Sequence, residues 1–318
     1  MLGGHSLKAF VLANQITQRF GLSLPLSDLF KAPTIAGLCD HLQKREAVLD
    51  KNVILLKKGS SKVPPLFLIH GQGGGVITFS HLARELECDC SVYGIQAVGY
   101  EGEADALSTV EEMAAHYIAS IRRIAPTMPI QLVGWSFGGL VAYEMTKQLE
   151  QQGEQVELLA MIDCLPLLDR ERISIDQSYK ELDAVILFAL LNGINQEDLA
   201  AVAEEEKMRF CWEEACKQKL FPDEEYRPEL LSKLRIHATN GLAIHKYRLS
   251  GQIDTDLHLF LASDESIRHQ VTTSKEVTRW KPFTTGQIKS AYFSGDHYTM
   301  LEMPHVQQMA KILNELMI

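Results

Sequence analysis

The sequence predicts an α/β fold with a mainly parallel sheet from about residue 53 onward, preceded by a short all-helical segment. Two observations indicate this fold. Apolar segments of strand length alternate with long amphipathic segments beyond residue 53, and residues 6–47 contain no strand pattern. Because each strand is followed by a helix, the connections are crossovers, and crossovers produce parallel pairing.

The helical segment begins with apolar side chains at helical spacing, and Gly21 ends this first helix. A second helix is expected to start at Pro33-Thr34 and to run through Leu42. The strands expected in the second part are Val53–Leu56, Leu66–Ile69, Ser91–Ala97, Ile130–Gly134, Leu158–Asp163, Leu257–Ser263 and Ile288–Phe293. The helices expected between or after them are Val110–Ile124, Gly138–Gln151 and Pro304–Met317.

These patterns divide the chain into residues 1–47, a charged linker at 48–62, and a large domain at 63–318. Residues 169–252 interrupt the strand–helix alternation with helical, acidic sequence. An insertion of this length between two strands is typical of an active-site lid.

Composition and charge exclude several classes of protein. A net charge of -10 argues against nucleic acid as a partner, since phosphate binding requires a basic face. No apolar stretch approaches the length that spans a bilayer, and no secretory signal is visible. The six cysteines form no C-x-x-C pair, so neither a disulfide nor a metal site is expected. We therefore expect a cytoplasmic protein that does not bind membranes.

A G-x-S-x-G motif follows the strand Ile130–Gly134 and opens the next helix, as Gly134-Trp135-Ser136-Phe137-Gly138. This strand–turn–helix context is typical of the α/β-hydrolase fold, in which the serine hydroxyl projects from a sharp turn. Side chains two positions away would collide there, which explains the glycines. The motif predicts Ser136 as a nucleophile; the alternative is a helix start without chemistry.

A serine nucleophile needs a histidine to accept its proton and a carboxylate to orient that histidine. His297 follows the last strand and precedes the last helix, where it reaches the carboxyl edge of the sheet, so we expect it to be the base. Asp163 and Asp264 both end strands after the serine, and either satisfies the order Ser, Asp, His.

The glycine-rich loop Gly71–Gly75 follows the strand that ends at His70. It matches neither the dinucleotide nor the Walker phosphate pattern. We expect this loop to form an oxyanion hole, with the Gln72 N–H as first donor (Gly71 as the alternative) and the Phe137 N–H as second. His70 precedes the serine, so a structural or oxyanion-loop role is expected for it.

The first segment resembles the second half of a peptidyl carrier domain of a nonribosomal peptide synthetase, through Gly3-Gly4-His5-Ser6 and Ala32-Pro33-Thr34. The resemblance implies that Ser6 bears 4′-phosphopantetheine, attached by a phosphopantetheinyl transferase. Without the resemblance, Ser6 would be interpreted as a helix N-cap. The helix that precedes this motif in carrier domains is missing, so we expect the chain to be the tail of a larger synthetase.

Residues 53–318 resemble a type I thioesterase domain, through Gly134-Trp-Ser-Phe-Gly-Gly139 and Gly295-Asp-His297. In this family the acid commonly follows the strand beside the nucleophile strand, which favours Asp163 over Asp264. The catalytic set implied is thus Ser136, Asp163 and His297.

The two resemblances together imply release of a carrier-bound peptidyl or acyl thioester through an acyl-serine, by hydrolysis or cyclisation, at the end of nonribosomal peptide or hybrid polyketide synthesis. The expected partners are that thioester and the upstream synthetase domains. Two alternatives remain open: a general serine esterase or lipase-like hydrolase, and a non-catalytic carrier and docking module.

Overall fold

The computed structural model describes residues 51–102, 104–166, 227–263 and 277–317, with scattered single residues at 34, 37, 38, 198, 201–203, 206, 210, 213, 214 and 217. Ser6, Asp264, nearly all of the predicted carrier segment and much of the predicted lid at 169–252 lie outside the described residues.

A seven-stranded sheet forms the centre of the described part, in the order β1-β3-β2-β4-β5-β6-β7. Its strands are β1 (Val53–Lys57), β2 (Leu66–Ile69), β3 (Val92–Ile95), β4 (Ile130–Trp135), β5 (Val156–Ile162), β6 (Leu257–Ala262) and β7 (Ile288–Phe293). Only β1 pairs antiparallel, with β3, and the other neighbours are parallel. The prediction of a mainly parallel α/β sheet is confirmed.

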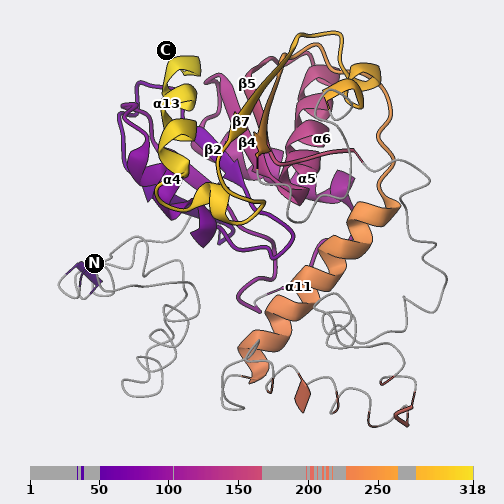
Figure 1. The fold of residues 1–318 in the computed structure, drawn as a ribbon. Helices are drawn as coiled ribbons and strands as arrows, with labels where there is room; N and C mark the ends of the chain where they lie inside the picture. Colours follow the sequence, from indigo (N-terminus) through magenta and orange to yellow (C-terminus); the bar gives the residue numbers. More distant parts are fainter. Residues whose placement is uncertain are drawn as a thin grey trace.

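Helices cover both faces of this sheet (Figure 1). Helices α4 (Ser80–Glu85) and α13 (Val306–Leu316) pack on one face, and α5 (Val110–Ile124) and α6 (Phe137–Gln151) pack on the other. Because both faces are covered, the central strands β2 and β4 are buried almost throughout, which explains their continuous apolar sequence. A long helix, α11 (Arg227–Lys246), lies below the sheet in the view of Figure 1.

Short 3-10 turns complete the described elements, at Ile77–Phe79, Lys281–Phe283 and Thr299–Leu301. Helix α5 shows how local sequence sets an element boundary. Thr109 Oγ1 accepts from the Glu112 N–H at 3.2 Å, and Glu112 Oε2 accepts from the Ser108 N–H at 3.3 Å. These two bonds form a variant of the capping box, in which the glutamate accepts from the residue before the N-cap Thr109, and they begin the helix at the residue that the periodicity predicts. None of the described helices is long and apolar enough to cross a membrane.

Strand β1 lies within residues 48–62, the segment predicted to be a linker, and it joins the sheet through β3. The sheet therefore begins at Val53, whereas the sequence predicts that the large domain starts at residue 63. The assignment of residues 1–47 to a separate domain stays a prediction.

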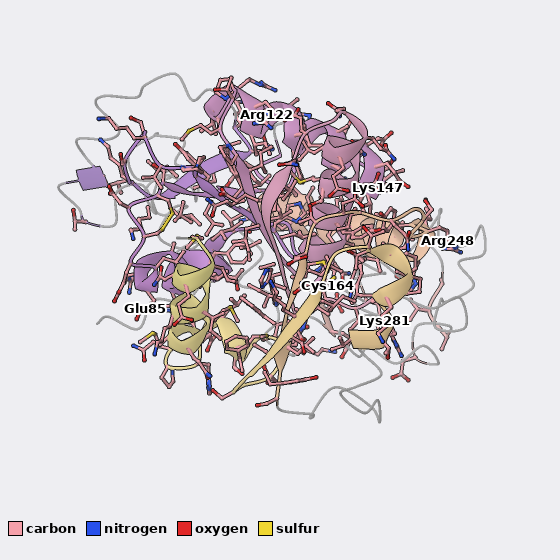
Figure 2. All side chains as sticks on the ribbon, turned by 90° about the horizontal axis from the view of Figure 1, so that it is seen from above. Glu85, Arg122, Lys147, Cys164, Arg248 and Lys281 are labelled. Atoms are coloured by element: carbon pink, nitrogen blue, oxygen red, sulfur yellow. A yellow bond between two sulfur atoms is a disulfide. The ribbon has the colours of Figure 1, made fainter. Side chains whose placement is uncertain are left out.

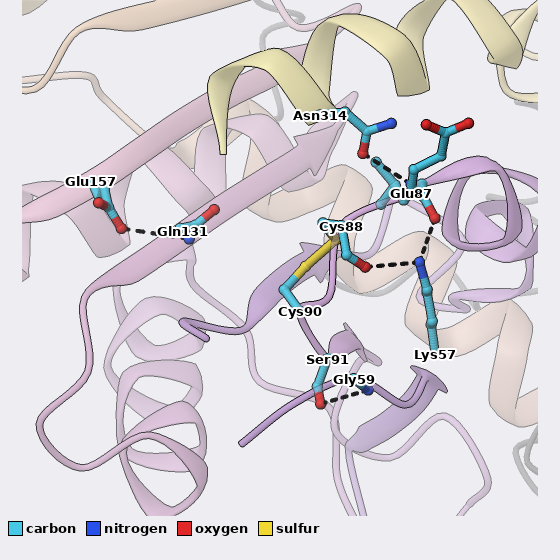
Figure 3. Close-up of a disulfide and its surroundings, with 10 residues drawn as sticks. Lys57, Gly59, Glu87, Cys88, Cys90, Ser91, Gln131, Glu157 and Asn314 are labelled. Carbon is cyan, nitrogen blue, oxygen red and sulfur yellow. Dashed lines mark hydrogen bonds between the residues drawn. A yellow bond between two sulfur atoms is a disulfide. The ribbon is translucent and has the colours of Figure 1, made fainter. Parts of the chain in front are cut away.

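The expectation that the chain has no disulfide is wrong for Cys88 and Cys90, which are bonded to each other (Figure 3). Their spacing is C-x-C, which differs from the C-x-x-C pattern on which the expectation depended. The bend between α4 and β3 brings the two Cα atoms to 5.2 Å, within the range that a disulfide spans. Lys57 Nζ donates to the Cys88 carbonyl at 3.0 Å and so ties this bend to β1.

Candidate active site

Ser136 occupies the turn between β4 and α6, with φ 55° and ψ -119°. Its N–H donates to the Ile162 carbonyl of β5 at 2.8 Å, which holds the turn against the neighbouring strand. A Cβ on Gly134 would lie 2.1 Å from the Gly138 carbonyl oxygen, and one on Gly138 would lie 2.3 Å from the His70 carbonyl oxygen. Backbone atoms therefore leave no room for a side chain at either glycine of the motif, as the sequence predicts.

Asp163 and His297 are hydrogen-bonded at 2.5 Å, from His297 Nδ1 to Asp163 Oδ2. The Asp163 side chain is fully buried, and its Oδ1 accepts from the Ala262 N–H at 3.1 Å. The two residues come from elements 134 positions apart in the chain. Because a carboxylate accepts only, the shared proton sits on Nδ1, which leaves Nε2 of His297 able to accept a proton.

The surroundings of Asp163 are closely packed. Cys164 follows it, is 3% exposed, and lies among packed side chains near the middle of the view in Figure 2. Trp280 Nε1 donates to the Cys164 carbonyl at 3.3 Å. A Cβ on Gly139 would lie 2.5 Å from Cys164 Cβ, so the second glycine of Gly138-Gly139 allows the nucleophile helix to approach β5.

The turn that carries His297 is folded by its neighbour Asp296. Asp296 Oδ1 accepts from the Tyr298 N–H at 2.9 Å and from the Thr299 N–H at 2.8 Å. The Thr299 N–H, the Thr299 hydroxyl and the Tyr298 N–H together hold the pKa of Asp296 below its usual value. Gly295 has φ 95°, where a side chain would be strained. The motif Gly295-Asp-His297 thus supplies one turn-forming glycine, one turn-forming carboxylate and the imidazole.

Trp135 connects the nucleophile turn to the histidine turn, a role that the sequence analysis missed. Its Nε1 donates to the His297 carbonyl at 3.1 Å, and its ring lies 5.3 Å from the imidazole, centroid to centroid. On the other side, a Cβ on Gly71 would lie 2.5 Å from the indole. Only the position of Trp135 next to Ser136 could have drawn attention to it.

Among the hydrogen bonds of the described residues, none joins Ser136 Oγ to the His297 ring. Such bonds are often long or misaligned in enzymes without substrate, and they tighten when the substrate binds. The two side chains are nevertheless brought to the same edge of the sheet. Trp135, which precedes Ser136, contacts the His297 ring in a tilted arrangement, and Asp163 follows the strand that pairs with β4.

His70 is completely buried and makes two hydrogen bonds. Its Nδ1 donates to the Gly71 carbonyl at 2.7 Å, and its Nε2 accepts from the Tyr117 hydroxyl at 2.7 Å. Burial lowers the pKa of His70 to about 4, so the ring is neutral at physiological pH. Nδ1 thus holds the glycine-rich loop and Nε2 ties the ring to α5, and this geometry supports a structural role.

The glycine-rich loop lies between the nucleophile helix and α11. Gln72, the predicted first oxyanion donor, accepts from Asn240 Nδ2 at 2.8 Å through its carbonyl. Its side-chain Nε2 donates to the His237 carbonyl at 3.3 Å. Phe137, the predicted second donor, is the first residue of α6, where free N–H groups and the helix dipole favour negative charge. Neither α11 contact could be predicted, because the helix lies within an insertion with no recognised motif.

Comparison with known proteins shows the family of the chain. Residues 64–317 match the family model of a thioesterase domain, and residues 1–42 match that of a phosphopantetheine attachment site. The chain is 31% identical over 320 residues to a dimodular nonribosomal peptide synthase of Bacillus subtilis (strain 168), covering 98% of this chain and 13% of that protein. It is 46% identical over 165 residues to malpibaldin synthetase of Mortierella alpina, covering 51% of this chain and 3% of that protein.

The solved structures that match the chain include a nonribosomal peptide synthetase and a thioesterase domain. Holo-AB3403, a four-domain nonribosomal peptide synthetase bound to AMP and glycine, matches with a TM-score of 0.70 and 27% identity, over 99% of this chain and 24% of that one. The NocB thioesterase domain, in covalent complex with a fluorophosphonate nocardicin G analogue, matches with a TM-score of 0.59 and 18% identity, over 84% of this chain and 100% of that one. The latter likeness concerns the fold alone.

Proposed function

Because the chain belongs to the thioesterase domain family, we propose that it releases an acyl or peptidyl chain from a carrier-bound thioester through an acyl-enzyme on Ser136. One observation carries this proposal: Asp163 and His297, hydrogen-bonded at 2.5 Å, lie at the same sheet edge as the strained Ser136 turn. A histidine held in this tautomer by a buried carboxylate is the arrangement that activates a serine hydroxyl.

In the first half of the reaction, His297 Nε2 takes the proton of Ser136 Oγ as the oxygen attacks the thioester carbonyl. Asp163 stabilises the imidazolium that forms, because its fully buried carboxylate faces Nδ1. The carbon–sulfur bond then breaks, and the imidazolium returns its proton to the departing sulfur. The acyl group is left on Ser136 as an oxygen ester.

In the second half, His297 deprotonates either water or a nucleophile of the product itself. That group attacks the ester carbonyl, and the proton held on His297 returns to Ser136 Oγ as the acyl–oxygen bond breaks. Hydrolysis gives a free acid, whereas an internal nucleophile gives a ring. In both halves the carbonyl oxygen becomes negative, and the Gln72 and Phe137 N–H groups are the proposed donors to it.

The carrier segment supplies the proposed route of the substrate. Residues 1–42 match a phosphopantetheine attachment site, and Ser6 stands in the motif that would accept the arm. Ser6 lies outside the described residues, so this part of the proposal depends on sequence alone. The proposed partners are upstream synthetase domains and a phosphopantetheinyl transferase, and the proposed location is the cytoplasm.

The experiment is intact-mass analysis of the chain after mixing with an N-acetylcysteamine acyl thioester, which carries the thiol end of a pantetheine arm. The parent protein is expected to gain the acyl mass and to release thiol catalytically, and Ser136→Ala is expected to do neither. Ser108→Ala changes an exposed serine far from the site in the chain and serves as the matched control. Unchanged turnover by Ser136→Ala would refute the acyl-serine mechanism.

The same assay separates the proposal from the general esterase. The matching oxygen ester is compared with the thioester at equal concentration. A higher kcat/KM for the thioester is the expected result, and a strong preference for the oxygen ester would favour the esterase.

A further inference from the structure

Helix α11 contacts Gln72 through three residues on one of its faces. Asn240 is 1% exposed, and its Nδ2 donates to the Gln72 carbonyl at 2.8 Å. Since a carbonyl only accepts, the amide nitrogen of Asn240 must be the atom that faces it. The His237 carbonyl accepts from the Gln72 side chain at 3.3 Å. A Cβ on Gly241 would lie 2.8 Å from Gln72 Nε2, so the glycine leaves room for that side chain.

The two peptide groups that flank Gln72 are held from opposite sides. The Gly71 carbonyl, which belongs to the same peptide group as the Gln72 N–H, accepts from His70 Nδ1 at 2.7 Å and from the Gly74 N–H at 3.0 Å. The next carbonyl, that of Gln72, accepts from Asn240. In a planar trans peptide, the N–H and C=O bonds point in opposite directions. The bonds to the Gly71 carbonyl therefore set the direction of the Gln72 N–H, and the Asn240 bond holds the peptide group that follows it, so that the Gln72 backbone is held on both sides.

We infer that Asn240 is a positioning residue for the oxyanion hole, which holds the Gln72 peptide so that its N–H faces the oxygen of the tetrahedral intermediate. This inference rests on the proposed function, in which Gln72 is an oxyanion donor. Asn240 makes no contact with the reacting atoms and acts through the loop. Helix α11, which lies within the predicted lid, thereby orients a group that takes part in the reaction.

A donor aimed at the oxyanion stabilises the transition state more than the bound substrate. Loss of the Asn240 contact should therefore lower kcat and leave KM nearly unchanged. A contact that merely docks α11 on the domain would instead change stability, or would change KM and kcat together.

The structure provides a matched control on the same helix. Ser232 Oγ donates to the Tyr100 carbonyl at 3.4 Å, so it also ties α11 to the domain, through a carbonyl that lies outside the glycine-rich loop Gly71–Gly75. Replacing Ser232 by Ala removes one α11 contact and leaves the Gln72 carbonyl held.

The test compares Asn240→Asp, Asn240→Ala and Ser232→Ala with the parent. Asn240→Asp keeps the shape of the side chain but places a carboxylate oxygen where the donor was. We expect kcat for the acyl thioester to fall about 10- to 100-fold in both Asn240 variants, less than the roughly 100- to 1,000-fold that loss of an oxyanion donor itself costs, with KM changed less than about threefold. The affinity for an acyl boronic acid, which forms a tetrahedral adduct on the serine, should fall in parallel. Ser232→Ala should keep the parent values for both.

Three results would overturn the inference: an unchanged kcat in either folded Asn240 variant, an equal fall in Ser232→Ala, or a fall in kcat without weaker boronate binding. Thermal denaturation identifies the folded variants, and Asn240→Ala, which adds no charge, replaces Asn240→Asp if the latter unfolds. Failure of the proposed function is recognised separately, because the parent itself would then neither turn over the thioester nor react with a fluorophosphonate at Ser136.

Discussion

Ser136 and Asp163 are the non-glycine residues of the described chain with positive φ, at 55° and 48°. Both end strands that pair with each other, and both belong to the proposed catalytic set. Such conformations cost of the order of 1–3 kcal/mol each and persist where the surroundings impose them. The strain is therefore placed at the two side chains whose direction matters most.

Asp163→Asn tests the choice between the two candidate acids. The amide cannot hold His297 in the required tautomer, so kcat should fall by roughly 10³- to 10⁴-fold. Asp264→Asn is the matched control, with an expected change of less than about threefold. The measurement is steady-state turnover of the acyl thioester. If Asp264→Asn loses turnover and Asp163→Asn keeps it, the orienting acid is Asp264.

Gly138→Ala tests the steric requirement of the nucleophile turn. The added methyl group would meet the His70 and Ile69 carbonyl oxygens at 2.3 and 2.4 Å, and backbone atoms cannot easily move away. We expect a loss of about 2 kcal/mol in the free energy of unfolding, measured by urea denaturation. Gly73→Ala adds the same methyl group into open space and should change that free energy by less than about 0.5 kcal/mol. Equal stabilities of the two variants would contradict this account.

At the scale of elements, α11 and α6 are joined by a buried polar contact. Tyr247, just beyond the end of α11, donates its hydroxyl to Glu144 Oε2 of α6 at 2.6 Å. Glu144 is 3% exposed and also accepts from Lys147 Nζ at 2.5 Å. Burial raises the pKa of Tyr247, so the hydroxyl remains a donor at all physiological pH values. The carboxylate thus anchors the end of α11 to the nucleophile helix.

Tyr247→Phe should lower the free energy of unfolding by about 2 kcal/mol, because a hydrogen bond to a buried charged group is lost. Tyr143→Phe is the comparison, since its hydroxyl donates to a neutral carbonyl, that of Phe283, at 2.8 Å. A loss of about 1 kcal/mol is expected there. Urea denaturation of both variants gives the two values, and a smaller loss for Tyr247→Phe than for Tyr143→Phe would oppose the proposed anchoring.

At the scale of the whole molecule, buried histidines couple stability to pH. His70 has a pKa of about 4 in the folded protein because burial disfavours its charged form, against an ordinary value of 6.5. The unfolded chain therefore binds a proton more readily than the native one. The stabilising contribution is complete above pH 6.5 and is lost as the pH falls from 6.5 towards 4. Burial also lowers the pKa of His237 and of His258, so protonation of these residues at low pH also favours the unfolded chain.

The expected loss from His70 is about 3 kcal/mol in the free energy of unfolding between pH 7 and pH 4. Denaturation of the parent and of His70→Asn across this pH range measures it, since the variant lacks the titrating ring. The variant should be less stable than the parent at pH 7 but should lose less stability on acidification. Parallel pH profiles for the two proteins would show that His70 does not titrate as described.

The sequence by itself determined the fold class, the nucleophile turn and the position of the histidine turn. These depend on local patterns: apolar runs of strand length that alternate with amphipathic helices, and a G-x-S-x-G motif placed between a strand and a helix. Local patterns could not choose between Asp163 and Asp264, because the sequence predicts that each follows a strand and satisfies the order Ser, Asp, His. They also could not show that Trp135 touches His297 or that Asn240 holds Gln72.

Only the tertiary structure shows the contacts of Asp163, Trp135 and Asn240, because each joins residues far apart in the chain. The Asp163–His297 bond spans 134 positions, and the Asn240–Gln72 bond spans 168. The partner in each case is selected by the order of strands in the sheet and by the packing of α11, and neither leaves a periodic signal in the sequence. The chemistry is thus encoded locally, whereas the orientation of the groups that perform it is set by distant contacts.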